Sequence, residues 1–254
     1  SVPRNGSVPR NGSVLGNGER VPGVVGRGDL RHPPLVGPAL QASGDDPFGE
    51  MLLEVLRREA PGAEAGMSVV PGENTSYTIV VAPPGIDRIF LHCPGANDTF
   101  GPEDVDTEIA ARARLFHFGY PPLMKRMFRG AGRELARVLG EAREAGAAVS
   151  LDLALPDPDS EAGKADWREI LAAALPHTDI FLPSLEELMF MLARDRFDEL
   201  TAGEAGIADS FTPQDVRSLA DECIAMGAPI LVIKCGHVGA YLRTADSLAP
   251  PDGL

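Results

Sequence analysis

The sequence predicts an α/β fold in which a doubly wound, mostly parallel sheet carries helices on both faces and a small β lid. From residue 44 to residue 254, short β-rich apolar runs alternate with amphipathic helical segments, as in sheets built from right-handed crossovers. The 254 residues are 44% hydrophobic, which is enough for one sizeable core. Two neighbouring β-rich runs also flank a Pro-Pro-Gly turn, and they predict the separate hairpin of the lid.

Residues 1–43 differ from the rest of the chain. The sequence Ser-Val-Pro-Arg-Asn-Gly occurs at 1–6 and again at 7–12, and residues 13–18 are a degraded third copy. Glycine and proline are frequent and apolar periodicity is missing, so this segment cannot bury enough surface to offset its ordering entropy. We therefore predict a disordered low-complexity tail over 1–43, either a solvated or non-native segment or a basic arm for an acidic partner, and a folded domain over 44–254.

The first elements of the predicted domain are a helix and a hairpin. Asp46 fits the N-cap of the helix, and Pro47 fits its first position. The hairpin strands are expected at 77–82 and 86–93, which places the lid strands at about residues 75–95. Apolar residues that recur at helical spacing are expected to face the core, namely Phe48, Met51, Leu52, Val55 and Leu56.

The remaining elements alternate along the chain. The strands are expected at 115–118, 148–153, 180–182 and 230–234, and the helices within 124–145, 167–174, 185–193 and 213–226. Such alternation favours a parallel sheet. In sheets of this kind, ligands bind at the carboxyl ends of the strands.

The composition excludes several classes of partner. The net charge of −14 argues against nucleic acid, because binding to a polyanion needs surplus Lys and Arg. No stretch approaches the roughly 18 apolar residues of a membrane span. The three cysteines show no Cys-x-x-Cys spacing, and no signal-peptide pattern opens the chain. We therefore expect a cytoplasmic protein with neither nucleic acid nor membrane as a partner.

Polar residues follow four of the predicted strands. They lie at 117–120, at Asp152, at 184–187 and at 234–236, and we expect them to converge on one edge of the sheet. Gly236 and Gly239 follow the last of these strands. Glycines there let backbone N–H groups approach a phosphate, although a tight turn between two strands uses the same residues. The dinucleotide-binding and Walker glycine patterns are both missing from the sequence.

Four segments, in this order, resemble motifs of the PfkB or ribokinase-like carbohydrate kinases. Residues 44–49 are similar to the Gly-Asp-Asp-x-Phe-Gly turn of that family, and residues 95–98 to a Gly-Ala-Asn segment on its lid. Residues 184–187 resemble its Asn-x-x-Glu motif, with Ser184 in place of asparagine, and residues 234–239 resemble its nucleotide-binding glycine turn. The resemblance covers residues 44–254 and implies a ribokinase-like fold and transfer of the ATP γ-phosphate to a sugar hydroxyl.

The resemblance also implies roles on the nucleotide side. Glu187 would orient water bound to Mg²⁺, unless it is merely a solvated carboxylate on a helix. Lys234 would place charge near the phosphates of ATP, or it would point into solvent. Ser184 would hydrogen-bond to the nucleotide, and Gly236 and Gly239 would admit it close to the backbone.

On the sugar side, Asn97 and Asp152 are the candidates for contacts with hydroxyl groups, because amide and carboxylate groups match the donors and acceptors of a polyol. Asp152 could instead cap a neighbouring element. By the same resemblance, the lid is a possible homodimer contact.

Two family motifs are missing, so the domain is expected to be incomplete at both ends. One is an N-terminal Gly-Gly-x-x-x-Asn segment, and the other is Asp-x-x-Gly-x-Gly-Asp, whose last aspartate accepts the proton of the attacking hydroxyl. No catalytic residue is therefore assigned in this chain. Loss of a positioned base costs about 10²–10⁴ in rate, so we expect an inactive kinase or, alternatively, a non-catalytic module that binds nucleotide or sugar.

Overall fold

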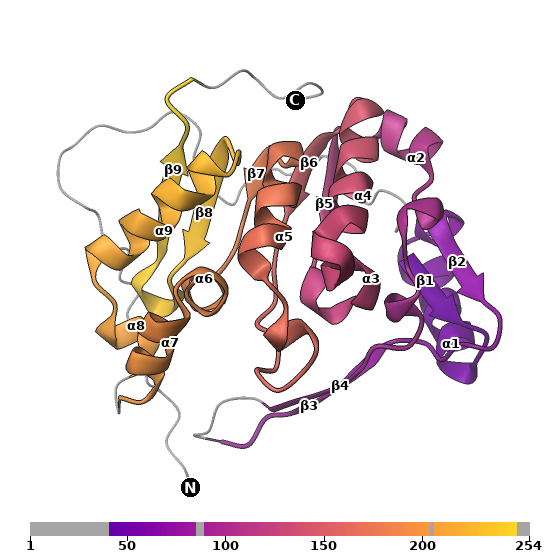
Figure 1. Cartoon of the computed structure of the whole chain (residues 1–254). Coiled ribbons are helices and arrows are strands. Elements are labelled where there is room, and N and C mark those ends of the chain that lie inside the picture. The colour runs from indigo at the N-terminus through magenta and orange to yellow at the C-terminus, as the bar shows by residue number, and fades with distance from the viewer. Residues whose placement is uncertain (1–40, 85–88, 204–205, 248–254) are drawn as a thin grey trace, which may run out of the picture. The chain divides into compact units, whose positions relative to one another are not determined.

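The computed structural model describes residues 41–84, 89–203 and 206–247 (Figure 1). Most of the predicted tail lies outside these residues. Its boundary at residue 43 is wrong, however, because Gln41–Gly44 form strand β1, which pairs in parallel with β2 (Met67–Val70). The turn predicted at 83–85 and the start of the second hairpin strand also lie partly outside the described residues.

Helix α1 (Pro47–Glu59) begins where the sequence predicts. The Asp46 carboxylate accepts a hydrogen bond from the Gly49 amide at 2.9 Å and another from the Thr75 hydroxyl at 2.6 Å, which ties the start of the helix to the loop before the hairpin. Hydrogen bonds from Thr75 hold the pKa of Asp46 below its ordinary value.

The apolar stripe of α1 is not buried, which corrects the expectation that it faces a core. Phe48 is 51% exposed, Met51 56% and Val55 39%. Within the described part of the chain, the elements that mainly contact α1 are β1 and the short turn Ala63–Gly66. Helical spacing predicts an amphipathic helix correctly, but burial needs a second layer that these residues do not supply.

The predicted hairpin is confirmed. Strand β3 (Tyr77–Val81) pairs antiparallel with β4 (Ile89–Cys93), so that Tyr77 lies opposite Cys93. All residues of β3 are exposed, and Figure 1 shows the hairpin as a two-stranded ribbon. Such a ribbon is at best marginally stable by itself in water.

The main sheet confirms the predicted fold class. Its order is β5-β6-β7-β8-β9, which follows the chain. The first four strands are parallel and the last pair is antiparallel. The strands are β5 (Leu115–Phe118), β6 (Ala148–Leu151), β7 (Ile180–Phe181), β8 (Ile230–Lys234) and β9 (Ala240–Thr244).

The helices that flank this sheet form a layer. The predicted helices at 167–174, 185–193 and 213–226 are confirmed, whereas the segment 124–145 forms two helices separated by a left-handed stretch at 130–132. The described helices after α1 are α2 (Thr107–Arg112), α3 (Lys125–Phe128), α4 (Arg133–Glu144), α5 (Trp167–Ala174), α6 (Leu185–Leu192), α7 (Arg194–Thr201), α8 (Ile207–Ser210) and α9 (Pro213–Ala225).

Helices α4, α5, α6 and α9 contact one another in that order, and α4 and α5 lie side by side in front of the sheet in Figure 1. Right-handed crossovers that all advance in one direction place their helices on the same face. The described residues therefore provide one of the two helical layers of a doubly wound sheet.

The core lies between this helical layer and the sheet. Its largest fully buried side chains include Leu139, Leu151, Trp167, Phe181 and Leu188. Among the described residues, no helix combines the length and the apolar character needed to cross a membrane.

Candidate functional site

The carboxyl ends of β6, β7 and β8 bring several predicted site residues together. The Lys234 amide donates to the Pro183 carbonyl at 2.8 Å, and Ser184 forms an isolated parallel bridge with Lys234. The chain after β7 therefore continues alongside β8 as far as Ser184. At the other side, the Asp152 amide donates to the Phe118 carbonyl at 2.9 Å, so Asp152 extends the pairing of β6 with β5.

Ser184 and Glu187 form a reciprocal capping box at the start of α6. The Ser184 amide donates to Glu187 Oε2 at 2.6 Å, and the Glu187 amide donates to Ser184 Oγ at 3.2 Å. This arrangement satisfies backbone donors that a helix end leaves free. The Ser184 side chain also hydrogen-bonds to the Glu187 carboxyl, which opposes the rise in the pKa of that group.

Glu187 is half-buried, which excludes the alternative of a solvated carboxylate on a helix. Burial raises its pKa, and the hydrogen bond from the Ser184 amide and the charge of Lys234 oppose that change. Both the amide and the side chain of Ser184 therefore hold the Glu187 carboxyl in place at the start of α6.

Asp152 and Lys234 form an ion pair across 82 positions of sequence. Lys234 Nζ lies 2.7 Å from Asp152 Oδ1 and 3.0 Å from Oδ2. Asp152 Oδ1 also accepts a hydrogen bond from the Leu153 amide at 2.8 Å. The Asp152 side chain is 17% exposed and that of Lys234 is 47% exposed. Lys234 thus does not simply point into solvent. The Asp152 carboxylate bonds both to Lys234 and to the amide of the following residue, Leu153.

The glycine turn links β8 to β9. Gly236 has φ 59° and Gly239 has φ 116°, conformations that favour glycine. The Cys235 amide donates to the Gly239 carbonyl at 2.8 Å, so the residues form a tight turn between two antiparallel strands. The turn and a phosphate-binding role are compatible, because the geometry leaves Gly236 at the edge of a cavity.

This cavity, of about 250 Å³, lies next to the ion pair. Polar groups from Lys234 and Ser184 meet apolar side chains along its wall. The residues from α8 that line it were not predicted, because a four-residue helix leaves no periodic signal in the sequence. The lining residues are Ser184, Leu185, Glu186, Ile207, Ala208, Lys234, Cys235 and Gly236.

Asn97 lies elsewhere, at the base of the hairpin. Its amide nitrogen Nδ2 donates to Ser76 Oγ at 3.0 Å, and the Ala96 amide donates to the Asn74 carbonyl at 2.7 Å. A Cβ on Gly95 would lie 2.3 Å from the same Asn74 oxygen, so a residue with a Cβ does not fit at position 95. Within the described ranges, no hydrogen bond joins Asn97 to Asp152 or Lys234.

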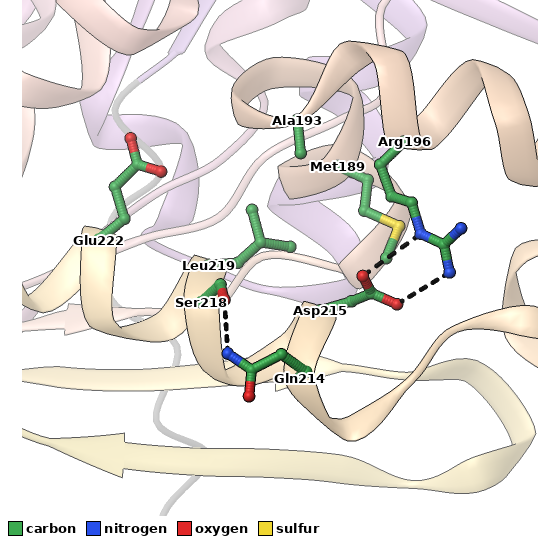
Figure 2. Close-up of a pocket in the computed structure, with 8 residues that line it drawn as sticks. All are labelled: Met189, Ala193, Arg196, Gln214, Asp215, Ser218, Leu219 and Glu222. Atoms are coloured by element: carbon green, nitrogen blue, oxygen red, sulfur yellow. Dashed lines mark hydrogen bonds and ion pairs between the residues drawn. The ribbon is translucent and has the colours of Figure 1, made fainter.

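A second cavity, of about 170 Å³, lies between α6, α7 and α9 (Figure 2). Arg196 donates to both carboxylate oxygens of Asp215 at 3.3 Å, and Gln214 bonds to Ser218 at 3.0 Å. Its polar groups therefore largely satisfy one another, and Asp215 also belongs to the capping box of α9. No predicted site residue lines this cavity.

The donor set at the sheet edge suits a hard cation. Glu187 and Asp152 offer carboxylate oxygens, whereas no group of three or more His, Cys, Asp or Glu that could hold a metal occurs in the described part of the chain. Mg²⁺ typically takes only one or two protein carboxylates and completes its shell with water and phosphate oxygens. The residues present fit Mg²⁺ that arrives with a nucleotide.

Known proteins resemble this chain in sequence. A family model described as pfkB family carbohydrate kinase matches residues 39–253. The Probable fructokinase-4 of Arabidopsis thaliana is 30% identical over 161 residues, covering 63% of this chain and 48% of the relative. An uncharacterized sugar kinase of Archaeoglobus fulgidus is 26% identical over 205 residues, covering 80% of this chain and 68% of the relative. The chain thus spans about half the length of the plant fructokinase that it matches.

Solved structures show the same fold. The ribokinase of Arabidopsis thaliana complexed with ribose and ATP superposes with a TM-score of 0.54 at 17% identity, covering 82% of this chain and 58% of that one. The fructokinase of Xylella fastidiosa with bound ATP gives 0.58 at 20% identity, covering 81% and 57%. These likenesses establish a ribokinase-like fold. Since the family model also spans most of the sequence, the chain belongs to the pfkB family of carbohydrate kinases.

Proposed function

We propose that this chain carries nucleotide and sugar sites of an ATP-dependent sugar kinase, which transfers the γ-phosphate of ATP to a sugar hydroxyl. The observation that carries the proposal is the meeting of Ser184, Glu187, Asp152 and Lys234 at the carboxyl edge of the sheet, beside a cavity of about 250 Å³. Phosphoryl transfer requires mainly positioning and charge stabilisation from the protein. A cation, a hydroxyl group and two carboxylates suit that task.

On the nucleotide side, Lys234 supplies charge for the phosphates and Ser184 supplies a hydroxyl group. The start of α6, which Ser184 caps, adds the partial positive charge of a helix N-terminus. Gly236 and Gly239 let the backbone approach the nucleotide, since neither residue has a Cβ. The apolar wall of the cavity, which includes Ile207, suits the base and ribose.

Glu187 is the residue that we assign to Mg²⁺, through a bound water. Mg²⁺, when bound, neutralises phosphate charge. The capping box holds the Glu187 carboxylate in place at the sheet edge, which supports this role.

Asn97 and Asp152 are the proposed contacts for sugar hydroxyls. Both have polar atoms that match a polyol, and Asn97 lies at the base of the lid. The lid itself is the proposed homodimer contact. Its exposed apolar side chains, among them Ile79 and Leu91, support pairing with a second copy.

The proton acceptor is the open element of the proposal. The sequence contains no Asp-x-x-Gly-x-Gly-Asp motif, so these 254 residues alone are proposed to be near inactive. The second candidate function is a non-catalytic module that binds nucleotide or sugar.

Titration calorimetry with ATP and Mg²⁺ tests the nucleotide site directly. Lys234→Met is expected to weaken ATP binding at least 10-fold, because charge-assisted hydrogen bonds to the phosphates are lost. Asp221→Asn removes a carboxylate from an exposed ion pair on α9 and is the matched control, with unchanged affinity. Equal ATP affinity in wild type and Lys234→Met would contradict the proposed nucleotide site.

A phosphorylation assay with a panel of sugars separates kinase from binding module. The chain is compared with a version extended by a segment that contains Asp-x-x-Gly-x-Gly-Asp. The proposal predicts a gain in turnover of about 10²–10⁴ on extension, the contribution expected of a positioned base. Unchanged turnover in a folded, ATP-binding extended protein would favour the binding module.

Cytoplasmic residence is also proposed, with small molecules rather than nucleic acid or membrane as partners. The net charge of −14 supports the exclusion of nucleic acid. Fractionation of the native cells, with antibody detection of the chain, would test the location.

A further inference from the structure

We infer that the Asp152/Lys234 ion pair makes nucleotide binding at this site depend on a divalent cation. The inference rests on the proposed nucleotide site and concerns how that site is controlled. Lys234 lines the cavity, yet its ammonium group is held by both oxygens of Asp152, at 2.7 and 3.0 Å. The group that should receive the phosphates is therefore already paired with an anion.

Asp152 cannot easily turn away to release the lysine. Its Oδ1 also accepts a hydrogen bond from the Leu153 amide, and its own amide and carbonyl bond to Phe118 and Tyr120, respectively. The carboxylate is mostly buried, whereas the lysine is half-exposed. Lys234 is thus the mobile partner, and a phosphate that draws it away leaves a fixed carboxylate behind.

The local charge count makes that exchange unfavourable without a cation. Glu187 interacts electrostatically with both Asp152 and Lys234, so two carboxylates share one ammonium group before any ligand arrives. A triphosphate adds several negative charges to this cluster. Burying an unpaired carboxylate beside them carries a large penalty. A divalent cation that accompanies the phosphates removes this penalty, since it compensates the carboxylate that Lys234 leaves.

The pair would therefore favour the nucleotide with its cation over the bare nucleotide. Asp152→Asn keeps an oxygen that can accept from Leu153 but removes the charge that holds Lys234. In this variant, Lys234 is free to meet the phosphates without a cation.

The test measures binding of ATP and of inorganic tripolyphosphate by calorimetry, in EDTA and in excess MgCl₂ at equal ionic strength. In EDTA, Asp152→Asn is expected to bind both ligands about 10-fold more tightly than wild type, which corresponds to about 1.4 kcal/mol. In MgCl₂, the two proteins are expected to differ by less than about threefold. Lys234→Met is expected to weaken binding of both ligands in EDTA and in MgCl₂. In EDTA, adding Asp152→Asn to Lys234→Met is expected to increase the affinity by less than adding Asp152→Asn to wild type.

Three results would overturn the inference. One is equal or weaker binding by Asp152→Asn in EDTA, another is a gain of the same size in MgCl₂, and the third is a change confined to sugar affinity. Asp221→Asn, the surface control, is expected to behave as wild type throughout. Circular dichroism checks folding, and Asp152→Ser replaces Asp152→Asn if the latter does not fold.

The outcomes also separate this inference from the proposed function. If wild type binds ATP with Mg²⁺ but Asp152→Asn shows no gain in EDTA, only the inference fails. If wild type binds neither ATP nor tripolyphosphate under any condition, the proposed nucleotide site fails, and the inference fails with it.

Discussion

Two regions of this chain contain similar apolar runs but use them differently. In the region from β5 to β9, the apolar residues lie between a sheet and a helical layer, and Leu139, Leu151 and Leu188 are completely buried. In the region from β1 to β4, most of the apolar face of α1, all of β3 and the first three residues of β4 are exposed. The difference shows that an apolar pattern determines the type of an element, whereas its burial depends on a partner layer.

The site lies in the first of these regions, which explains its geometry. Parallel strands bring their carboxyl ends to one edge, and pairing beyond β7 extends this register to Ser184 and Lys234. The hairpin region contributes Asn97 from a segment that is held by the loop at 74–76. The sheet edge thus fixes the charged cluster, whereas local hydrogen bonds at the base of the hairpin fix Asn97.

The largest expected effect compares leucines from the two regions. Leu188→Ala in α6 removes a fully buried side chain and should cost about 2–5 kcal/mol of unfolding free energy. Leu91→Ala in β4, where the side chain is 56% exposed, should cost less than about 0.5 kcal/mol. Urea unfolding followed by circular dichroism measures both. Equal losses would mean that the hairpin is covered in solution, for example by a second copy.

A glycine in the second region, from β1 to β4, gives the next largest effect. A Cβ on Gly44 would lie 2.1 Å from the Glu73 carbonyl oxygen, so Gly44→Ala forces the backbone apart and should cost about 1–3 kcal/mol. Gly203→Ala is the control, since a Cβ there would lie 3.4 Å from its nearest neighbour, the Leu200 carbonyl oxygen. Hydrogen exchange should show the loss locally, around β1 and β2. A loss spread over β5 to β9 would contradict the separation of the two regions.

Two helix caps distinguish the site from the rest of its region. Ser184→Ala and Thr212→Ala each remove the N-cap of a helix that has a capping box, and each should cost about 1 kcal/mol. Only Ser184→Ala should also weaken ATP binding, because only Ser184 lines the cavity. Thermal unfolding and calorimetry measure the two effects. If Thr212→Ala weakened ATP binding as much, the effect would come from general destabilisation.

The smallest expected effect is a difference in pH dependence between Glu187 and Asp46. Burial raises the pKa of Glu187 above its ordinary 4.5, so its contribution to stability falls as the pH rises through that raised value. Hydrogen bonds from Thr75 lower the pKa of Asp46 below its ordinary 3.8, so its contribution is present above that value and is lost as the pH falls through the lowered one.

Unfolding free energies of Glu187→Gln and Asp46→Asn between pH 3 and pH 7 check these slopes. Relative to wild type, Glu187→Gln should gain stability towards neutral pH, because the neutral amide carries no buried charge. Asp46→Asn should lose stability over the same interval. Parallel slopes for the two variants would contradict the assigned causes.

Much of the fold follows from local signals that the sequence carries openly. Asp46 with Pro47, and Thr212 with Pro213, mark two helix starts that the structure confirms. The break at 130–132 inside a predicted helix was missed, because left-handed conformations at Gly130, Ala131 and Gly132 depend on packing against α5. The short helix α8 was missed because four residues carry no period.

By itself, the sequence determined the order of elements, the parallel sheet and the identity of the polar residues at its edge, because each depends on neighbours in the chain. Only the tertiary structure decided that Lys234 pairs with Asp152, that Glu187 is half-buried, and that most of the apolar stripe of α1 is exposed. Those facts depend on contacts between distant residues, or on the lack of a packing layer, and no local pattern encodes either.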